Sequence, residues 1–288
     1  MSGAGVQLRF APALGEWVAQ HLAQGQSPAA LVDAMCERQV APEAARAIVD
    51  AFVRARERGA PLPIDTVDTV DAEAQRARLA DGPVIETGDR RIRVAMRTDA
   101  PALAVLQGVL DAGECEQLIA LARPRLKPST LVDPMSGRDV RSDMRASLGM
   151  FFRPAETPLI ERLDRRLAAL MGLPASHGEG LQLLHYPAGA GSAPHFDFLQ
   201  PVNEANRASI ARSGQRISTL VCYLNDVAGG GETDFPQRGL QVTPQRGNAV
   251  YFEYDGRDER SLHASRPVLA GEKWVATKWM RERPFISQ

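Results

Sequence analysis

The second half of the chain is a run of short strand-like segments, and this pattern limits the fold more than any other feature. Clusters of glycine, proline and aspartate separate the segments, which cover residues 180–186, 216–224, 239–243, 248–254 and 273–281. Many short strands with turn signals between them favour an antiparallel sandwich or barrel, because a parallel sheet needs a crossover helix after each strand. We therefore expect an α+β protein with a largely antiparallel strand region.

Helices are expected only before these strands. Asp111 can cap a helix over residues 114–122, and Thr157-Pro158 marks the start of a longer one. Strand-like runs at 91–96 and 103–110 precede both helices. After the second helix we expect strands alone.

The N-terminal part follows a helical period instead. Residues 12–58 carry apolar side chains at i, i+3, i+4 and i+7, which predicts three short helices. No sustained period follows, so the expected organisation is a helical region at 1–60, a linker at 61–82 and a main domain at 83–288. The helical region fits either a partner-binding bundle or an appendage that only stabilises the main domain.

Charge and apolar patterning exclude several classes of protein. The net charge is −1, and residues 1–60 hold six arginines against six acidic residues, so the chain lacks the basic footprint of a nucleic-acid-binding protein. It shows neither a basic leader nor an apolar run of the ~18 residues that span a bilayer, so no membrane partner is expected. Three scattered cysteines fit reduced thiols and a cytoplasmic location. The sequence carries no signal for an oligomeric state.

His195 and Asp197 form a His-x-Asp pair in a strand-like context. Side chains two positions apart point to the same face of a strand, so the imidazole and the carboxylate can bind one ion together. Such a short motif is weak alone, because it often arises by chance. His263 would complete the two-histidine, one-carboxylate set that leaves open positions on non-haem iron(II). Taken singly, either histidine could instead be an ordinary polar residue with local hydrogen bonds.

The last strand-like segment begins with a lysine. Period-two alternation places Lys273, Val275, Thr277 and Trp279 on one face and Trp274, Ala276 and Lys278 on the other. A lysine that faces the interior is costly unless it meets an anion, and the distal carboxylate of 2-oxoglutarate is a suitable one. Lys278, on the other face, is expected to be solvated.

Further motifs occur in one order from about residue 114 to residue 281. They include Glu114-Cys115-Glu116-Gln117-Leu118-Ile119, Arg145-Ala146-Ser147-Leu148-Gly149, His195-Phe196-Asp197, Tyr223-Leu224-Asn225-Asp226-Val227, Gly230-Gly231-Glu232-Thr233 and Lys273-Trp274. This series resembles the prolyl 4-hydroxylase branch of the iron(II)- and 2-oxoglutarate-dependent dioxygenases. The resemblance implies a double-stranded β-helix, or jelly roll, with helices packed against one side and a metal at the open end. It also implies that 2-oxoglutarate and O2 become succinate and CO2 while a C–H bond is hydroxylated, with ascorbate rescuing oxidised iron.

The same resemblance assigns roles to individual residues. It implies that iron and catalysis depend on His195, Asp197 and His263, that 2-oxoglutarate is held by Lys273, Tyr186 and Thr219, and that the substrate groove is lined by Arg145, Glu179, Arg216 and Trp279. Tyr186 and Trp279 could instead be core aromatic residues.

Two positions depart from the family pattern. Ser192 stands where relatives that hydroxylate peptidyl proline usually have a tyrosine, and Arg281 stands where a histidine is often found. Both departures concern the substrate rather than the chemistry. A protein or peptide residue, proline or similar, is the leading expectation, and a free amino acid or small metabolite is the second. A catalytically silent jelly roll that binds a metal or partner is a third, but it would have no need of Lys273.

Overall fold

The computed structural model describes residues 7–58, 61–68, 78–99, 102–128, 131–132, 139–140, 147–254 and 259–287. The chain divides into two compact units, Met1–Arg76 and Ala77–Gln288. The division falls within the segment predicted as a linker.

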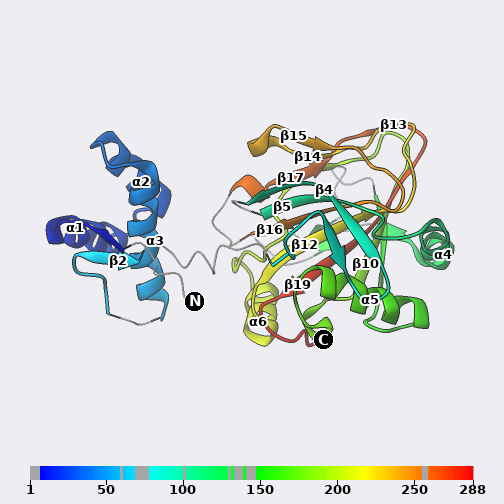
Figure 1. Ribbon diagram of the computed structural model, residues 1–288, viewed down its shortest axis with the longest axis horizontal. Helices are drawn as coiled ribbons and strands as arrows, with labels where there is room; N and C mark the ends of the chain where they lie inside the picture. The colour runs from blue at the N-terminus through cyan, green and yellow to red at the C-terminus, as the bar shows by residue number, and fades with distance from the viewer. Residues whose placement is uncertain are drawn as a thin grey trace. The chain divides into compact units, whose positions relative to one another are not determined.

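The first unit contains the three predicted helices (Figure 1). They are α1 (Pro12–Ala23), α2 (Pro28–Glu37) and α3 (Pro42–Arg58). Each begins with proline, whose missing N–H is not needed in a first helical turn. The apolar stripes meet in a small core that includes Val18, Leu31 and Phe52.

A short strand pair completes this unit and was not predicted. β1 (Gln7–Arg9) pairs antiparallel with β2 (Thr66–Asp68), so part of the predicted linker belongs to the N-terminal unit. A three-residue strand is too short to show the alternation by which strands are found in a sequence.

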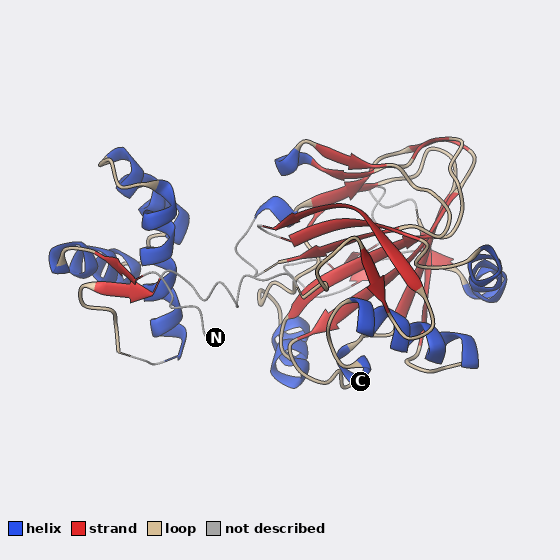
Figure 2. Ribbon diagram, viewed as in Figure 1, coloured by secondary structure: helices blue, strands red, loops and turns tan. Residues whose placement is uncertain are grey.

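The second unit is built from antiparallel sheets (Figure 2). Among the described residues, the large sheet has nine strands in the order β3-β4-β5-β16-β12-β19-β10-β9-β6. These are β3 (Val84–Glu86), β4 (Arg91–Asp99), β5 (Ala102–Gln107), β16 (Ala249–Glu253), β12 (Arg216–Tyr223), β19 (Lys273–Arg281), β10 (Leu181–Tyr186), β9 (Leu148–Phe152) and β6 (Lys127–Pro128). The small sheet has the order β11-β17-β14-β15 and consists of β11 (Ser192–His195), β17 (His263–Ser265), β14 (Thr233–Phe235) and β15 (Leu240–Val242). Two short pairs are separate, β13 (Gly229–Gly230) with β18 (Val268–Ala270) and β7 (Leu131–Val132) with β8 (Asp139–Val140).

Each face of the large sheet has its own apolar core. Leu220 of β12 packs in a cluster with residues of α4 (Ala112–Ala122) and α5 (Pro158–Leu170). Its neighbour Val221 points the opposite way, into a cluster shared with Phe235 of the small sheet. Successive side chains of a strand alternate between faces, so the central strands are covered by helices on one side and by strands on the other. This is the predicted jelly roll with helices against one side.

The two helices predicted in this unit begin where expected. Asp111 and Glu114 form a reciprocal capping box at the start of α4, and the Thr157 hydroxyl accepts from the Ile160 N–H at the start of α5. These contacts satisfy N–H groups that have no partner within the helix.

The prediction that no helix follows was wrong. α6 (Glu204–Ser213) lies between β11 and β12, and the Asn203 side chain caps it by accepting from the Asn206 N–H. Its only large apolar residue is Ile210, so it lacks the apolar stripe by which a sequence reveals a helix.

The expectation that Lys278 is solvated was also wrong. Its side chain is completely buried, and its Nζ lies 2.8 Å from Asp164 Oδ1 on α5. The period of β19 assigned Lys278 to the correct face, but α5 covers that face.

We expect Lys278→Ala to lower the free energy of unfolding by about 3–5 kcal/mol, because it leaves the buried carboxylate of Asp164 without its charge partner. Chemical denaturation would measure the change. The control is the double variant Lys278→Met with Asp164→Asn, which removes both charges and keeps an acceptor for the Ala155 N–H that Asp164 binds. The double variant should be less damaged than the single one, and equal damage would argue against an important ion pair.

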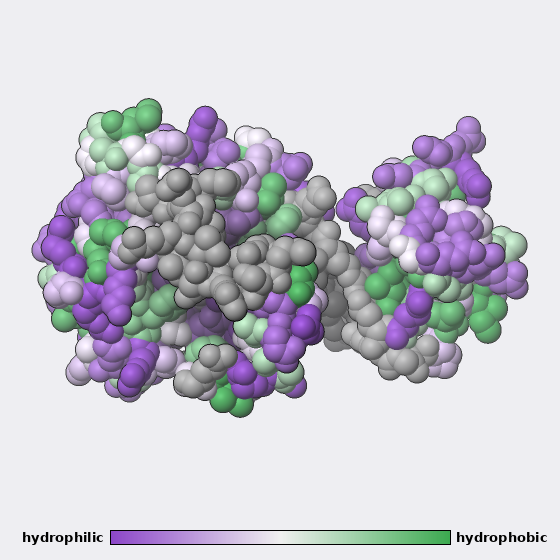
Figure 3. Space-filling view, turned by 180° about the vertical axis from the view of Figure 1, so that it is seen from behind, coloured by the Kyte–Doolittle hydropathy of each residue, from purple (hydrophilic) through white to green (hydrophobic). Residues whose placement is uncertain are grey.

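Among the described residues, no helix combines the length and apolar character needed to cross a membrane. The face in Figure 3 mixes hydrophilic and hydrophobic residues, with the hydrophobic ones in small groups.

Candidate active site

Three predicted metal ligands meet in one cluster. Nitrogen or oxygen atoms of His195, Asp197 and His263 all lie within 4.8 Å of one another. His195 and His263 are cross-strand partners on β11 and β17, and Asp197 follows two positions after His195. The distances are 3.8 Å from His195 Nε2 to Asp197 Oδ1 and 3.6 Å from His263 Nε2 to Asp197 Oδ2. The small sheet therefore brings together residues far apart in the sequence.

Both histidines are oriented by their own strands. His195 Nδ1 lies 2.9 Å from the Ala193 carbonyl oxygen, and His263 Nδ1 lies 3.0 Å from that of Ser261. A carbonyl oxygen can only accept, so each Nδ1 is the donor in these contacts and each Nε2 is directed toward Asp197. Such outer contacts are typical of metal-binding histidines. Two imidazole nitrogens and one carboxylate are a donor set that fits iron(II).

Asp197 is buried and ionised. Burial opposes its ionisation, but the neighbouring His263 and His195 outweigh that effect and lower its pKa to about 2. The Thr219 hydroxyl donates to Asp197 Oδ2 at 2.8 Å and lies 3.1 Å from the Tyr254 hydroxyl. The structure thus places Thr219 against a candidate metal ligand, which suits it to hold the carboxylate in position.

A cavity of about 470 Å³ opens beside this cluster. Its wall includes the three candidate ligands and one face of β19, namely Lys273, Val275, Thr277 and Trp279. These four are the residues that alternation assigned to one face, so that prediction is confirmed. Tyr186 and Arg216 also line the cavity, and Thr219 is not among its lining residues.

Lys273 carries a buried ammonium group. The residue is 2% exposed, its Nζ donates to Ser265 Oγ at 2.8 Å, and Nζ lies 5.4 Å from the centre of the Tyr186 ring. Burial lowers its pKa to about 7, although Glu232 acts in the opposite direction. A buried ammonium whose described hydrogen-bond partner is a hydroxyl is suited to receive an anion from the cavity.

Two serines extend this part of the cavity, and one of them, Ser265, was missed as a site residue. Ser192 Oγ accepts from the Ser265 N–H at 2.9 Å, and Ser265 Oγ accepts from Lys273. Both serines line the cavity. Ser265 follows His263 by two positions on β17, so the same-face rule for strands could have identified it. Asp197, to which that rule was applied, lies beyond the end of β11.

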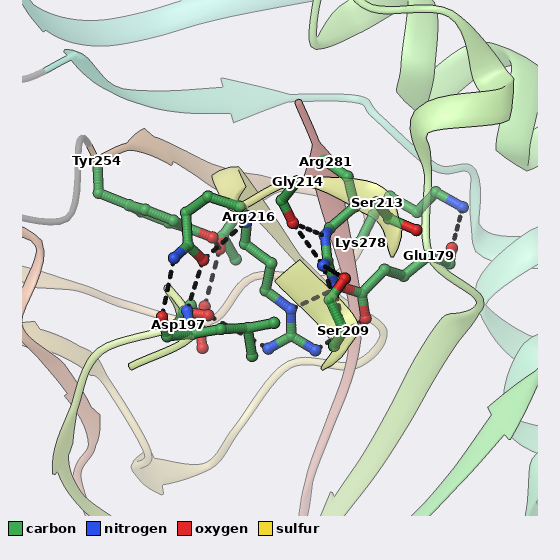
Figure 4. Close-up of polar contacts among 12 residues, drawn as sticks. Glu179, Asp197, Ser209, Ser213, Gly214, Arg216, Tyr254, Lys278 and Arg281 are labelled. Carbon is green, nitrogen blue, oxygen red and sulfur yellow. Dashed lines mark hydrogen bonds and ion pairs between the residues drawn. The ribbon is translucent and has the colours of Figure 1, made fainter. Parts of the chain in front are cut away.

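The residues predicted for the substrate groove lie in different places. Figure 4 labels two of them, Glu179 and Arg216. Arg216 and Trp279 line the cavity, with the guanidinium carbon 4.0 Å from the centre of the indole ring. Glu179 lies behind Arg216, is 7% exposed and binds it through both carboxylate oxygens. Arg145 lies outside the described residues.

Comparison with known proteins agrees with this geometry. A family model described as the 2OG-Fe(II) oxygenase superfamily matches residues 181–281. Prolyl 4-hydroxylase 1 of Arabidopsis thaliana is 40% identical over 203 residues, covering 64% of this chain and 70% of the relative. Probable prolyl 4-hydroxylase 3 of the same plant is 39% identical, covering 62% and 69%.

A solved structure, the viral collagen prolyl hydroxylase of Paramecium Bursaria Chlorella virus-1 with 2OG, is 26% identical with a TM-score of 0.48 and covers 62% of this chain and 95% of that one. The region matched by the family model, residues 181–281, contains the metal cluster, the buried lysine and the strands that position them. On the strength of the sequence relatives, the chain belongs to the prolyl 4-hydroxylase family of iron(II)- and 2-oxoglutarate-dependent dioxygenases.

Proposed function

We propose that this dioxygenase hydroxylates a prolyl residue of a protein or peptide. The observation that supports it is the joint lining of one cavity by the candidate metal ligands, the buried ammonium of Lys273 and the Arg216–Trp279 pair. Relatives that match 64% and 62% of this chain carry the name prolyl 4-hydroxylase.

Each part of the cavity has a role in this proposal. His195, Asp197 and His263 hold iron(II), which with O2 and 2-oxoglutarate supplies the oxidising chemistry. The ammonium of Lys273 and the hydroxyl of Ser265 bind the distal carboxylate of 2-oxoglutarate. Arg216 and Trp279 then bind the substrate on the opposite part of the wall. Thr219 keeps Asp197 in position through its hydrogen bond to Oδ2.

To test the proposal, the iron-loaded enzyme would be incubated with 2-oxoglutarate and a panel of proline-containing peptides, with free proline beside them. Mass spectrometry would locate any added oxygen atom. Oxygen gained on a peptidyl proline supports the proposal. Turnover that modifies only free proline, or another small molecule, would replace it with the metabolite alternative.

The position of Ser192 predicts which peptides are poor substrates. A serine fills much less of the cavity than a tyrosine, so a repetitive or collagen-like proline peptide should be held loosely. Misplacement of the reacting atoms can cost around a hundredfold in rate. We expect Ser192→Tyr to improve hydroxylation of such a peptide relative to the unmodified enzyme, measured as kcat/KM.

Ser192→Ala is the matched control. It removes the acceptor for the Ser265 N–H but adds no bulk, so it separates loss of that hydrogen bond from a change in cavity shape. Efficient hydroxylation by the unmodified enzyme, with no gain in Ser192→Tyr, would show that this position does not set the preference.

Binding of 2-oxoglutarate should depend on pH through Lys273. Burial holds the pKa of Lys273 at about 7, and a bound carboxylate favours the charged form and raises this pKa. Below pH 7 the ammonium is already charged, so affinity is steady there. Above pH 7 binding must take up a proton, and affinity falls by up to about tenfold per pH unit. Calorimetry on metal-loaded, oxygen-free protein would measure the slope, which Lys273→Arg should abolish because arginine stays charged.

We also propose that ascorbate sustains turnover by reducing oxidised iron, and that the protein works in the cytoplasm. The first proposal follows from the family. For the second, the support is three free cysteines, of which Cys115 and Cys222 are buried. Burial raises the pKa of Cys115 to about 11, which suits an inert, reduced thiol.

A further inference from the structure

One buried carboxylate is shared by two arginines beside the cavity (Figure 4). Glu179 Oε1 accepts from Arg216 Nε at 2.7 Å and from Arg281 Nη1 at 2.9 Å, and Oε2 accepts from Arg216 Nη2 at 2.8 Å. Arg216 and Arg281 are also cross-strand partners on β12 and β19, where the register shifts. Like charges on directly opposed residues destabilise a sheet, and the Glu179 carboxylate offsets this repulsion by binding both arginines.

The sharing leaves positive charge without a full counter-charge. The other described contacts of Arg281 are neutral oxygens, namely the Gly214 carbonyl and the carbonyl and hydroxyl of Ser209. The nearby Lys278 contacts the Glu179 backbone carbonyl, and its own charge is matched by Asp164. Among the described contacts of these side chains, two guanidinium groups therefore depend on one carboxylate.

Two other carboxylates do not remove this excess. Asp197 faces the two candidate metal histidines, and a divalent ion would take up its charge. Glu282 accepts from the Gln215 N–H, one residue after the Gly214 that Arg281 contacts. Its side chain is exposed to solvent, which screens its charge.

The unmatched charge reaches the cavity through Arg216. Arg281 is 1% exposed and lies in the interior, whereas Arg216 forms part of the cavity wall. The Arg216 guanidinium stacks on Trp279, and its Nη1 donates to the Asp197 carbonyl oxygen at 3.2 Å. A cationic, planar donor group thus lies directly beside the candidate metal cluster.

We propose that Arg281 determines substrate specificity. Because Arg281 shares the Glu179 carboxylate, the positive charge of Arg216 is only partly balanced where it faces the cavity. The cavity therefore selects a substrate with a carboxylate next to the hydroxylated residue. The inference rests on the proposed peptide hydroxylation and names the class of peptide. The carboxylate can come from an acidic side chain beside the target or from the end of the peptide chain. Arginine suits either source, because its planar fork matches a carboxylate.

Two pairs of peptides of equal length test the proposal. In the first pair proline is followed by aspartate or by asparagine, and in the second proline is the last residue, as the free acid or as the amide. Calorimetry on metal-loaded, oxygen-free enzyme with 2-oxoglutarate measures binding, and kcat/KM measures oxygen transfer. In at least one pair the carboxylate peptide should bind about tenfold to a hundredfold more tightly than its neutral partner, the difference expected between charged and neutral hydrogen bonds. The pair that shows the preference identifies the source.

Variants of Arg281 then link the preference to this residue. Arg281→Gln removes the charge and should abolish most of the preference, while Arg281→Lys keeps the charge and should retain it. Arg283→Gln is the matched control. Exposed Arg283 donates to the carbonyls of Ile210 and Ala211 on α6, the helix that Arg281 also contacts through Ser209, and it has no described contact with Glu179. That control loses one positive charge nearby and should leave the preference unchanged.

Equal binding of both members in both pairs would overturn the proposal, even where proline is hydroxylated. If no peptide gains oxygen while 2-oxoglutarate is consumed, peptide hydroxylation is wrong, but the binding ratios still decide whether the cavity selects a carboxylate. If circular dichroism shows that Arg281→Gln does not fold, the peptide pairs on the unmodified enzyme and Arg281→Lys decide. A preference that persists in a folded Arg281→Gln would refute the role of Arg281.

Discussion

His263→Ala is expected to lose bound iron(II) and to reduce succinate formation by about a thousandfold or more. A bound metal typically supplies several kcal/mol of catalysis, and each ~1.4 kcal/mol corresponds to a factor of ten in rate. His263 Nε2 lies 3.6 Å from Asp197 Oδ2, so removing the imidazole leaves a two-ligand remnant of the cluster. Metal analysis and a succinate assay on the same preparation would measure both effects.

His185→Gln is the control for this prediction. His185 lies in the same unit, but its Nε2 binds Glu272 and it is not among the cavity-lining residues. This variant should keep its iron and its turnover. Full activity in His263→Ala would show that another residue completes the metal site.

Lys273→Ala should raise the 2-oxoglutarate concentration required for turnover by several hundredfold while leaving the iron content unchanged. The variant removes the buried charge partner proposed for the distal carboxylate, a loss of about 3–5 kcal/mol. Steady-state kinetics with 2-oxoglutarate as the varied substrate would measure the shift in KM.

Lys278→Met provides a matched comparison on the same strand. Both lysines of β19 are buried, but Lys273 faces the cavity and Lys278 faces Asp164 of α5. The Lys278 variant should lose stability with little change in KM for 2-oxoglutarate. If instead Lys278→Met raised KM and Lys273→Ala did not, the co-substrate site would be assigned to the wrong face of the strand.

The features that could be predicted from the sequence depend on local spacing. Alternation along β19 identified the cavity face from Lys273 to Trp279, and the His-x-Asp spacing identified two members of the metal cluster. Asp111 and Thr157 correctly predicted the starts of α4 and α5, because a capping residue contacts the backbone within the first helical turn.

Several of the features that were missed depend on contacts between distant segments. Alternation separates the two faces of a strand but does not reveal what covers each face. The ion pair between Lys278 and Asp164 could therefore not be predicted from the sequence of β19. Thr219 was assigned to 2-oxoglutarate by position in the family pattern, whereas its observed hydrogen bond is to Asp197. The sharing of Glu179 by Arg216 and Arg281 likewise joins three separate strands or loops.

The two halves of the site belong to different sheets. The candidate metal ligands lie on or beside β11 and β17 of the small sheet, while Lys273 lies on β19 of the large one. A molecule that binds the metal at one end and Lys273 at the other therefore ties the two layers of the sandwich together. A ligand that binds only the folded state stabilises it in proportion to the logarithm of its concentration over its dissociation constant. In the proposed binding mode, iron and 2-oxoglutarate therefore stabilise the contact between the two sheets, and removal of either should lower the free energy of unfolding.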